Sequence, residues 1–425
     1  MTAKRRIPLR HVIAVFIGNG LEFYDFLTFA YFEVYIGHAF FPSTNPSMSL
    51  LASTATFGVG FLTRPIGAIV IGGMGDRVGR KPAMLLSFWI MGIAILGVAL
   101  TPSYAQIGIA APVLVVLWRL LQGFALGGNV GPTTAYMVEA APAMNRGFYT
   151  AMQYATQDCA GLTASVVGLS LSLVLSKAAL GDWGWRVAFL IGVAIVPFGI
   201  YLRRDLPETL SIGDADEAPA AGAAEPRARV RDHMRIIVLG LVMLGGTTIG
   251  SYTLNYMTTY ALDTLRLAAG FAFGVGIVNT AFSIVWETLS GILSDKFGRK
   301  PVALGPGIVL LISILPGFWI IGHFRTAIAL YAVVAWLASI ASLAVTPPII
   351  MISETLPPSI RSGAVATVYA FAIAIFGGSV HSVITALIAT THNPMAPAWY
   401  WTGAALCFLI AVALTRESAP AKTMR

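Results

Sequence analysis

Long apolar stretches, separated by short polar or charged clusters, dominate the pattern of this 425-residue chain. Stretches such as 12–35 and 236–260 reach the roughly 20 residues that an α-helix needs to cross the hydrocarbon core of a bilayer. The strands of a membrane β-barrel would be only about 10 residues long and would alternate in hydrophobicity. The pattern therefore predicts an all-α polytopic membrane protein with twelve transmembrane helices, at 11–36, 51–74, 83–101, 107–136, 147–175, 186–203, 233–262, 270–293, 301–322, 326–352, 363–391 and 397–415.

The longest interruption of this pattern lies in the middle of the chain, at residues 204–235. This segment is rich in Ala, Pro, Gly and charged residues and has no apolar periodicity, which is typical of a flexible or weakly helical linker. We therefore expect an N-terminal six-helix bundle at 1–203, a cytoplasmic linker at 204–235, and a C-terminal six-helix bundle with a short tail at 236–425.

Two motifs occur once in each half. The segment GGMGDRVGRKP at 72–82 recurs as GILSDKFGRKP at 291–301, which places their aspartates 219 residues apart. A glutamate followed seven residues later by an arginine, at 139–146, recurs at 354–361, which is 215 residues further on. Two different motifs at nearly one offset indicate an internal duplication.

The repeated motifs bring charges to the predicted cytoplasmic ends of the helices. An aspartate there can accept charge-assisted hydrogen bonds from arginine side chains or from helix N-termini. We expect these charges to form a network across each half that stabilises one conformer and is released in the other. The expected gating residues are Asp76, Arg77, Arg80, Glu139, Arg146, Asp295, Lys296, Arg299, Glu354 and Arg361.

Composition and charge support a membrane protein and exclude a nucleic-acid-binding one. Hydrophobic residues make up 57% of the chain and charged residues only 11%, whereas soluble domains carry roughly 25% charged residues. Of the 27 Lys and Arg residues behind the net charge of +8, 21 lie on one side of the predicted membrane and 4 on the other. This is the positive-inside rule, so both termini are expected in the cytoplasm. Only Arg64 and Arg119 fall within spans, and Arg64 is expected to snorkel or to brace a helix.

Five further motifs accompany the duplicated loop: GNGLEFYDF at 18–26, GFLTRPIG at 60–67, RLLQG at 119–123, GFYT at 147–150 and WGWR at 183–186. The duplicated loop resembles the signature of the major facilitator superfamily, whose members are built from inverted repeats around a site at the membrane midplane. With the further motifs, the chain resembles the metabolite–proton symporter family, and within it the bacterial citrate and tricarballylate carriers. The resemblance covers nearly the whole chain and is denser in the first half. It implies proton-coupled uptake across the inner membrane of a bacterium.

The first span carries acidic residues at membrane depth, where polar groups are costly and usually functional. Asn19, Glu22 and Glu33 fall on one helical stripe, and Asp25 lies about one turn from Glu22. We expect Glu22 and Asp25 to take part in proton coupling or gating, with a structural hydrogen bond to a neighbouring helix as the alternative. Asn19 is expected to contact the cargo, and Glu33 to reach the far interface.

The fourth span carries a polar ribbon that includes Arg119, Gln122 and Asn129 on one helical face. A planar guanidinium suits a carboxylate, so we expect Arg119 to bind a carboxylate of the cargo, with Gln122 and Asn129 as hydrogen-bonding partners. The alternative for Arg119 is a structural ion pair with an acid such as Glu22 or Asp158.

Three ionisable residues depart from the pattern that citrate carriers lead us to expect: Asp158, Glu287 and His381. Extra acids accommodate a trianionic cargo only if they are protonated or face away from it, and His381 could offset them by becoming cationic. We expect Asp158 and Glu287 to add to proton coupling, and His381, Gln157 and Asn255 to contact the cargo. The same acids would suit a zwitterionic osmolyte of the betaine or proline type.

The sequence favours a secondary transporter over other membrane proteins. It contains no HExxH motif, no Ser/His/Asp arrangement and no pore-lining filter loop, so neither an enzyme nor a channel is expected. An exporter or a transporter-like nutrient sensor remains an alternative. No metal or cofactor is expected, because Cys159 and Cys407 lie in apolar surroundings without metal-ligand spacing. The expected partners are protons, a citrate-, tricarboxylate- or dicarboxylate-like cargo and membrane lipid, around a monomer without a cleaved signal peptide.

Overall fold

The computed structural model of the chain describes residues 9–77, 80–140, 146–204, 233–419 and 422. Every regular element in this part of the chain is a helix. Side chains are described at these positions except 9–19, 21–22, 75–77, 80–81, 84, 128–140, 146, 194–196, 198–204, 358–363 and 366.

Each predicted span of the first half coincides with helical structure. Two short elements, α5 (Tyr104–Ile107) and α8 (Lys177–Ala179), cap the far ends of the long helices, and a π-helical turn at Leu180–Gly184 follows α8. The long helices are α1 (Leu9–Phe40), α2 (Pro46–Leu62), α3 (Arg64–Arg77), α4 (Arg80–Leu100), α6 (Ala110–Ala140), α7 (Arg146–Val174) and α9 (Trp185–Arg204).

The second span is divided into α2 and α3 by a break at Thr63, which the sequence pattern did not predict. Pro65 has no N–H, and its ring would clash with the carbonyl group of Phe61 in a continuous helix. The N–H group of Thr63 donates to that carbonyl group instead. The break places Arg64 at the first position of α3, where it is buried.

The spans of the second half also coincide with helices. Two π-helical turns interrupt them, at Tyr260–Thr264 after α10 and at Ile373–Gly377 between α14 and α15. Such turns are frequent at functional sites. The helices are α10 (Met234–Thr259), α11 (Ala269–Phe297), α12 (Arg299–Phe324), α13 (Ala327–Thr355), α14 (Pro358–Ala372), α15 (Gly378–Thr391) and α16 (Ala396–Leu414).

The described helices are those of a multi-pass membrane protein. Within the described residues, nine helices are long and apolar enough to cross a membrane, and 85–100 adds a shorter apolar helix. Large apolar side chains such as Ile69, Trp89 and Ile328 are exposed on the outside of the bundle. Such a surface is suited to lipid as the surrounding medium.

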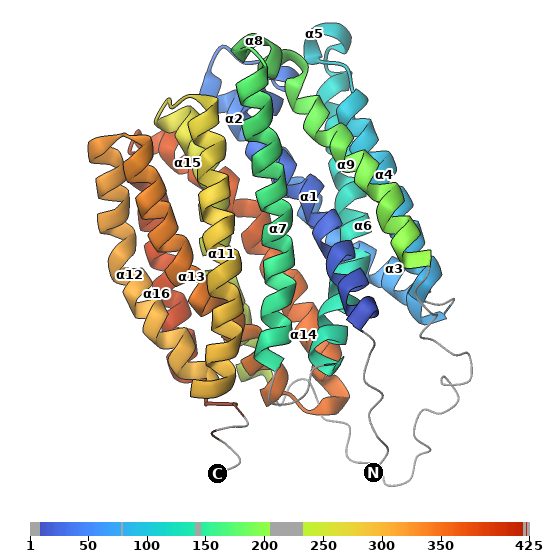
Figure 1. Cartoon of the computed structure of the whole chain (residues 1–425), viewed down its shortest axis with the longest axis vertical. Coiled ribbons are helices and arrows are strands. Elements are labelled where there is room, and N and C mark those ends of the chain that lie inside the picture. Colours follow the sequence, from blue (N-terminus) through green and yellow to red (C-terminus); the bar gives the residue numbers. More distant parts are fainter. Residues whose placement is uncertain (1–8, 78–79, 141–145, 205–232, 420–421, 423–425) are drawn as a thin grey trace.

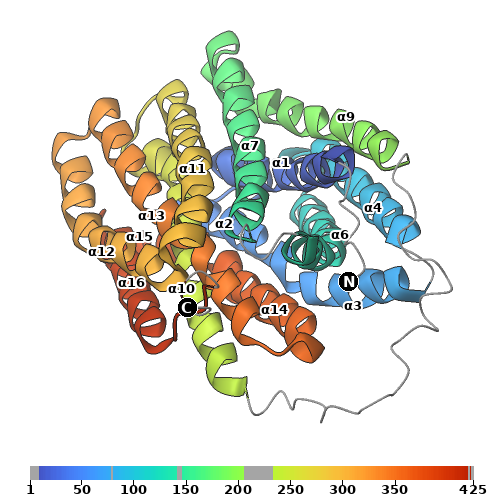
Figure 2. The same cartoon turned by 60° about the horizontal axis from the view of Figure 1, so that its bottom comes forward.

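The two halves meet along two seams, α7 against α11 and α2 against α15. Figures 1 and 2 show α7 and α11 side by side, with α1 to α9 mainly on one side of this seam and α10 to α16 on the other. Glycines permit the close approach: a Cβ atom at Gly58 would collide with the carbonyl group of Gly378, and one at Gly291 with that of Gly147. Small residues at helix interfaces allow backbones to approach in this way.

The start of α1 and the end of α16 lie at the same end of the molecule, at the bottom of Figure 1. We call this the lower end and its opposite the upper end. The turn between α11 and α12 also lies at the lower end, so Asp295 in the last turn of α11 lies there too. Glu33 is seven residues from the end of α1, toward the opposite end of the molecule. The predicted linker at 204–235 falls almost entirely outside the described residues.

Candidate functional site

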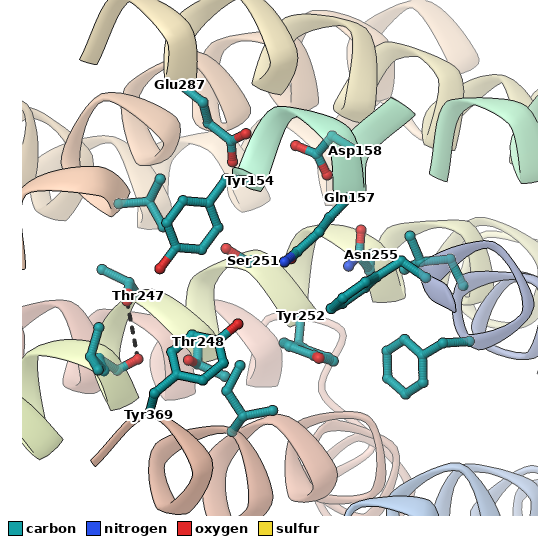
Figure 3. Close-up of a pocket in the computed structure, with 16 residues that line it drawn as sticks. Tyr154, Gln157, Asp158, Thr247, Thr248, Ser251, Tyr252, Asn255, Glu287 and Tyr369 are labelled. Carbon is teal, nitrogen blue, oxygen red and sulfur yellow. Dashed lines mark hydrogen bonds between the residues drawn. The ribbon is translucent and has the colours of Figure 1, made fainter. Parts of the chain in front are cut away.

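A central cavity lies between the two halves. Helices α1 and α7 of the first half line it, together with α10, α11, α13 and α14 of the second. Figure 3 shows the polar side chains that converge on it from α7, α10 and α11. Its polar lining comprises Tyr154, Gln157, Asp158, Thr247, Thr248, Ser251, Tyr252, Asn255, Glu287 and Tyr369.

Two carboxyl groups face each other in this cavity, one from each half. Asp158 on α7 and Glu287 on α11 both line the cavity, and each carboxyl group lies in the electrostatic field of the other. Figure 3 shows the two carboxyl groups pointing toward one another. Two ionised carboxylates that face each other in a buried site repel, so this arrangement favours a proton on one of the two.

Two amide side chains supply further hydrogen-bonding groups. The Oδ1 atom of Asn255 accepts from Asn279 at 3.1 Å and from the Tyr31 hydroxyl at 3.5 Å. Gln157 and Tyr369 both line the cavity, and within the described part of the chain the buried Nε2 atom of Gln157 has no partner. A cargo atom that accepts a hydrogen bond can satisfy this amide. None of the residues lining the cavity is basic.

A smaller cavity of about 230 Å³ lies inside the first half, and Asp25, Arg64, Arg119 and Gln122 line it. Phe26 lines both cavities, so its ring is the side chain that they share. Several polar atoms in this smaller cavity are buried and, among the described residues, lack hydrogen-bond partners: Asp25 Oδ1, Arg64 Nε, Arg119 Nε and Gln122 Nε2. Unpaired polar groups at membrane depth are costly, so this cavity is suited to a polar occupant such as water.

Arg119 is held by neutral groups rather than by a carboxylate in contact. Its Nη1 atom donates to Gln122 Oε1 at 2.6 Å and its Nη2 atom to the Phe57 carbonyl group at 3.4 Å. The guanidinium lies 4.3 Å from the centroid of the Phe29 ring. Asp158, one of the ion-pair partners weighed from the sequence, lines the central cavity instead. Direct contact between Arg119 and cargo stays a prediction, because Arg119 does not line the central cavity.

Arg64 connects the two halves next to Phe26, the side chain that lines both cavities. Its guanidinium lies 4.0 Å from the centroid of Phe61 and 4.9 Å from that of Phe26, and it hydrogen-bonds the Tyr252 side chain on α10. Of the two roles expected from the sequence, this geometry supports bracing rather than snorkelling.

Glu33 does not reach the far interface, so that sequence prediction is wrong. Its side chain is fully buried, and its Oε1 and Oε2 atoms contact Thr259 Oγ1 at 2.5 Å and His381 Nδ1 at 2.9 Å. The physical reason is that α1 continues for seven residues beyond Glu33, to Phe40, so Glu33 is one to two turns below the helix end. His381 does not line the central cavity; it stacks on Phe57 with ring centroids 4.6 Å apart.

A charge network closes the lower end of the α7–α11 seam. Asp295 accepts hydrogen bonds from the backbone N–H groups of Gly147 at 3.0 Å and Phe148 at 3.1 Å, in the first turn of α7. Buried Arg299 contacts Asp295 at 2.5 Å and Glu354 at 3.1 Å. Five expected gating residues belong to the second half. The side chain of Arg361 lies outside those that the structure describes, and of the other four the structure brings three together here. The fourth, Lys296, instead lies 5.4 Å from the ring centroid of Phe297.

A family model described as "Sugar (and other) transporter" matches residues 11–229. The chain is also 35% identical over 412 residues to the citrate–proton symporter of Klebsiella pneumoniae, a match that covers 96% of this chain and 92% of that one. The chain belongs to the sugar (and other) transporter family.

Two further comparisons describe its place in this transporter family. The chain is 34% identical to the alpha-ketoglutarate permease of Escherichia coli (strain K12), across 96% of this chain and 93% of that one. Its fold matches that of the xylose transporter XylE from E. coli in a partially occluded inward-open conformation, with a TM-score of 0.75 and 18% identity over 96% of this chain and 98% of that one. This is the major facilitator fold. The expected fold class and family are confirmed.

Sequence reasoning missed parts of the site in this family member. The sequence did not predict roles for Thr259 and Glu417, because neither residue belongs to a recognisable motif. Their hydrogen-bond partners are more than a hundred residues away in the sequence. Some predicted side chains lie outside those that the structure describes, and their roles stay predictions: Asn19, Glu22, Asp76, Arg77, Arg80, Asn129, Glu139, Arg146 and Arg361.

Proposed function

We propose that this transporter takes up a small carboxylate together with protons, by alternating access of the central cavity to the two sides of the membrane. The observation that carries the proposal is the cavity itself, which both halves line and which contains the acidic side chains of Asp158 and Glu287. A site between two bundles that move against each other is the arrangement by which such transporters work. The citrate and alpha-ketoglutarate carriers among its relatives support the cargo class.

In this proposal the central cavity binds the cargo and the smaller cavity exchanges a proton. In the central cavity, the amide of Gln157 and hydroxyl groups such as that of Ser251 donate hydrogen bonds to a cargo carboxylate. In the smaller cavity, Asp25 takes up and releases a proton, and the positive charge of Arg119 responds to it through space. Closure at the lower end uses Asp295, and closure toward the upper end uses Glu33 with His381.

The lower end faces the cytoplasm in this proposal. The 21 basic residues that the positive-inside rule counts lie in the segments assigned to that side. Both termini are then cytoplasmic, and the protein acts as a monomer in the inner membrane of a bacterium.

A second cargo class is favoured by one specific observation. The central cavity combines two acids with the tyrosines Tyr154, Tyr252 and Tyr369, and its lining has no basic residue. Aromatic faces beside acids attract quaternary ammonium groups. A zwitterionic osmolyte of the betaine type is therefore the second candidate.

Transport assays in proteoliposomes distinguish these cargo classes. Radiolabelled di- and tricarboxylates and betaines are offered with and without an inward pH gradient. We expect a carboxylate to accumulate, the pH gradient to accelerate this, and a protonophore to abolish it. Accumulation of betaine alone would replace the cargo assignment, and accumulation that follows a sodium gradient at fixed pH would overturn proton coupling.

A further inference from the structure

The carboxyl groups of Asp158 and Glu287 come from the two halves and face each other in the central cavity, where two ionised groups would repel. Asp158 lies on α7 and Glu287 on α11, the helices that form the main seam. We propose that these two carboxyl groups bind one shared proton, and that closure of the α7–α11 seam around the cargo depends on it. This inference rests on proton-coupled transport as the proposed function and identifies an additional proton site in it.

No basic side chain lines the cavity around Asp158 and Glu287, so a bound proton is the available way to neutralise one of their negative charges. Glu287 is only 6% exposed, and its Oε2 atom is buried without a partner in the described part of the chain. Two negative charges in contact at such a site would repel strongly, because little water screens them. The titratable side chains that face the pair from α1, α7, α10 and α14 are the neutral groups Tyr31, Tyr154, Cys159, Tyr252 and Tyr369.

The position of the pair connects this proton to movement. When the halves separate along α7 and α11, the two carboxyl groups part and each becomes accessible to water. The shared proton is then lost readily, because the hydrogen bond that held it no longer exists. Closing the seam therefore takes up one proton, in addition to any proton that Asp25 carries in the separate cavity of the first half.

Amide substitutions test for a shared proton. In Asp158→Asn, the amide can donate to the Glu287 carboxylate without any proton, and Glu287→Gln can do the same for Asp158. We expect each single variant to lose one proton per cargo molecule, measured from reversal potentials in proteoliposomes. The double variant should also lose one proton and not two, because the pair holds a single proton. Ser170→Ala, an exposed position on the same helix, is the matched control and should retain the parent value.

Thermal unfolding of the cargo-free protein provides a measurement that does not depend on transport. As pH falls from 8 to 5.5, the parent should gain more in Tm than either single variant, because only the parent pair needs a proton to form. A purely structural role would lower the Tm of the variants equally at every pH, and that result would overturn the proposal.

The outcomes separate this inference from the proposed function. A parent protein without proton-driven uptake would overturn the proposed function, while the pH dependence of Tm would still test the pair. A proton-coupled parent whose variants keep the full stoichiometry would overturn the shared proton alone. Loss of two protons in the double variant would show two independent sites, and sodium-dependent binding that both single variants abolish would show a metal-ion site instead. If one single variant fails to fold, the other carries the same expectation.

Discussion

Arg119 shows how the transporter keeps a charged side chain at membrane depth without an ion pair in contact. Two of its donors are satisfied by the amide of Gln122 and the carbonyl group of Phe57, and the Phe29 ring covers the guanidinium. Cation–π contacts in desolvated sites contribute about 2 kcal/mol. The planar fork is essential to this arrangement, because its donors point in two fixed directions.

Arg119→Lys should therefore keep the charge but lose the geometry. We expect the protein to reach the membrane. The contact with a cargo carboxylate that the sequence predicts for Arg119 would be lost, which weakens cargo binding by about 1–3 kcal/mol, as for a charge-assisted hydrogen bond, and reduces transport accordingly. Equilibrium binding and initial uptake rates measure the two effects. Arg266→Lys, at an arginine whose side chain is 74% exposed, is the matched control. A variant that binds every tested carboxylate as tightly as the parent would remove Arg119 from the cargo pathway.

At the scale of elements, the first turn of α12 is held by a side chain from beyond the last long helix. The Glu417 carboxylate accepts hydrogen bonds from the backbone N–H groups of Arg299 at 2.9 Å and Lys300 at 3.0 Å. A carboxylate at a helix N-terminus is favoured by the unpaired N–H groups and the helix dipole. Burial alone would raise the pKa of Glu417, but these and further backbone hydrogen bonds outweigh it and lower the pKa.

This lowered pKa predicts a pH-dependent effect of Glu417→Gln. A carboxyl group with a lower pKa in the folded state stabilises the fold at pH values above its unfolded pKa of about 4.3. That contribution is lost as pH falls through the lower, folded pKa. We expect the variant to unfold at a lower temperature than the parent at pH 7, and the difference to shrink below about pH 4. A difference that stays constant from pH 7 to pH 3.5 would contradict the ionic role of Glu417.

The helices themselves could be predicted from the sequence, but their interruptions and contacts could not. Apolar length alone specifies a helix in a membrane, because every backbone group must be paired within the segment. The break at Thr63 follows from Pro65 and the π-helical turn at Ile373–Gly377 from local hydrogen bonds, and apolar length records neither. The partnership of Asp158 and Glu287 depends on which helices pack together, and no pattern along one helix determines that.

At the scale of the whole molecule, the sequence shows an internal repeat and an uneven distribution of basic residues. The distribution of basic residues predicts how the protein is oriented in the membrane. The described starts and ends of the chain lie at the lower end, together with the Asp295 network. The error over Glu33 has the same origin as the missed pairs: its partners Thr259 and His381 come from the other half. Contacts between halves join residues that lie far apart in the sequence, so residue spacing within one half cannot reveal them.

Reporter fusions test the orientation of the molecule. Fusions placed at Ala220 and at the C-terminus should both report a cytoplasmic location, because the basic residues that retain loops in the cytoplasm flank both positions. A fusion at Arg325, between α12 and α13, should report the opposite side. A periplasmic signal at Ala220 or at the C-terminus would contradict the twelve-span topology.

Phe26 is the side chain that the two cavities have in common, and this has an evolutionary consequence. The smaller cavity is built entirely from residues of the first half, whereas most polar groups of the central cavity come from α7, α10 and α11. Substitutions that reshape the central cavity for a new nutrient therefore leave the lining around Asp25 and Arg119 intact. New cargo specificity can therefore evolve in the central cavity while the proton site at Asp25 in the smaller cavity is inherited unchanged.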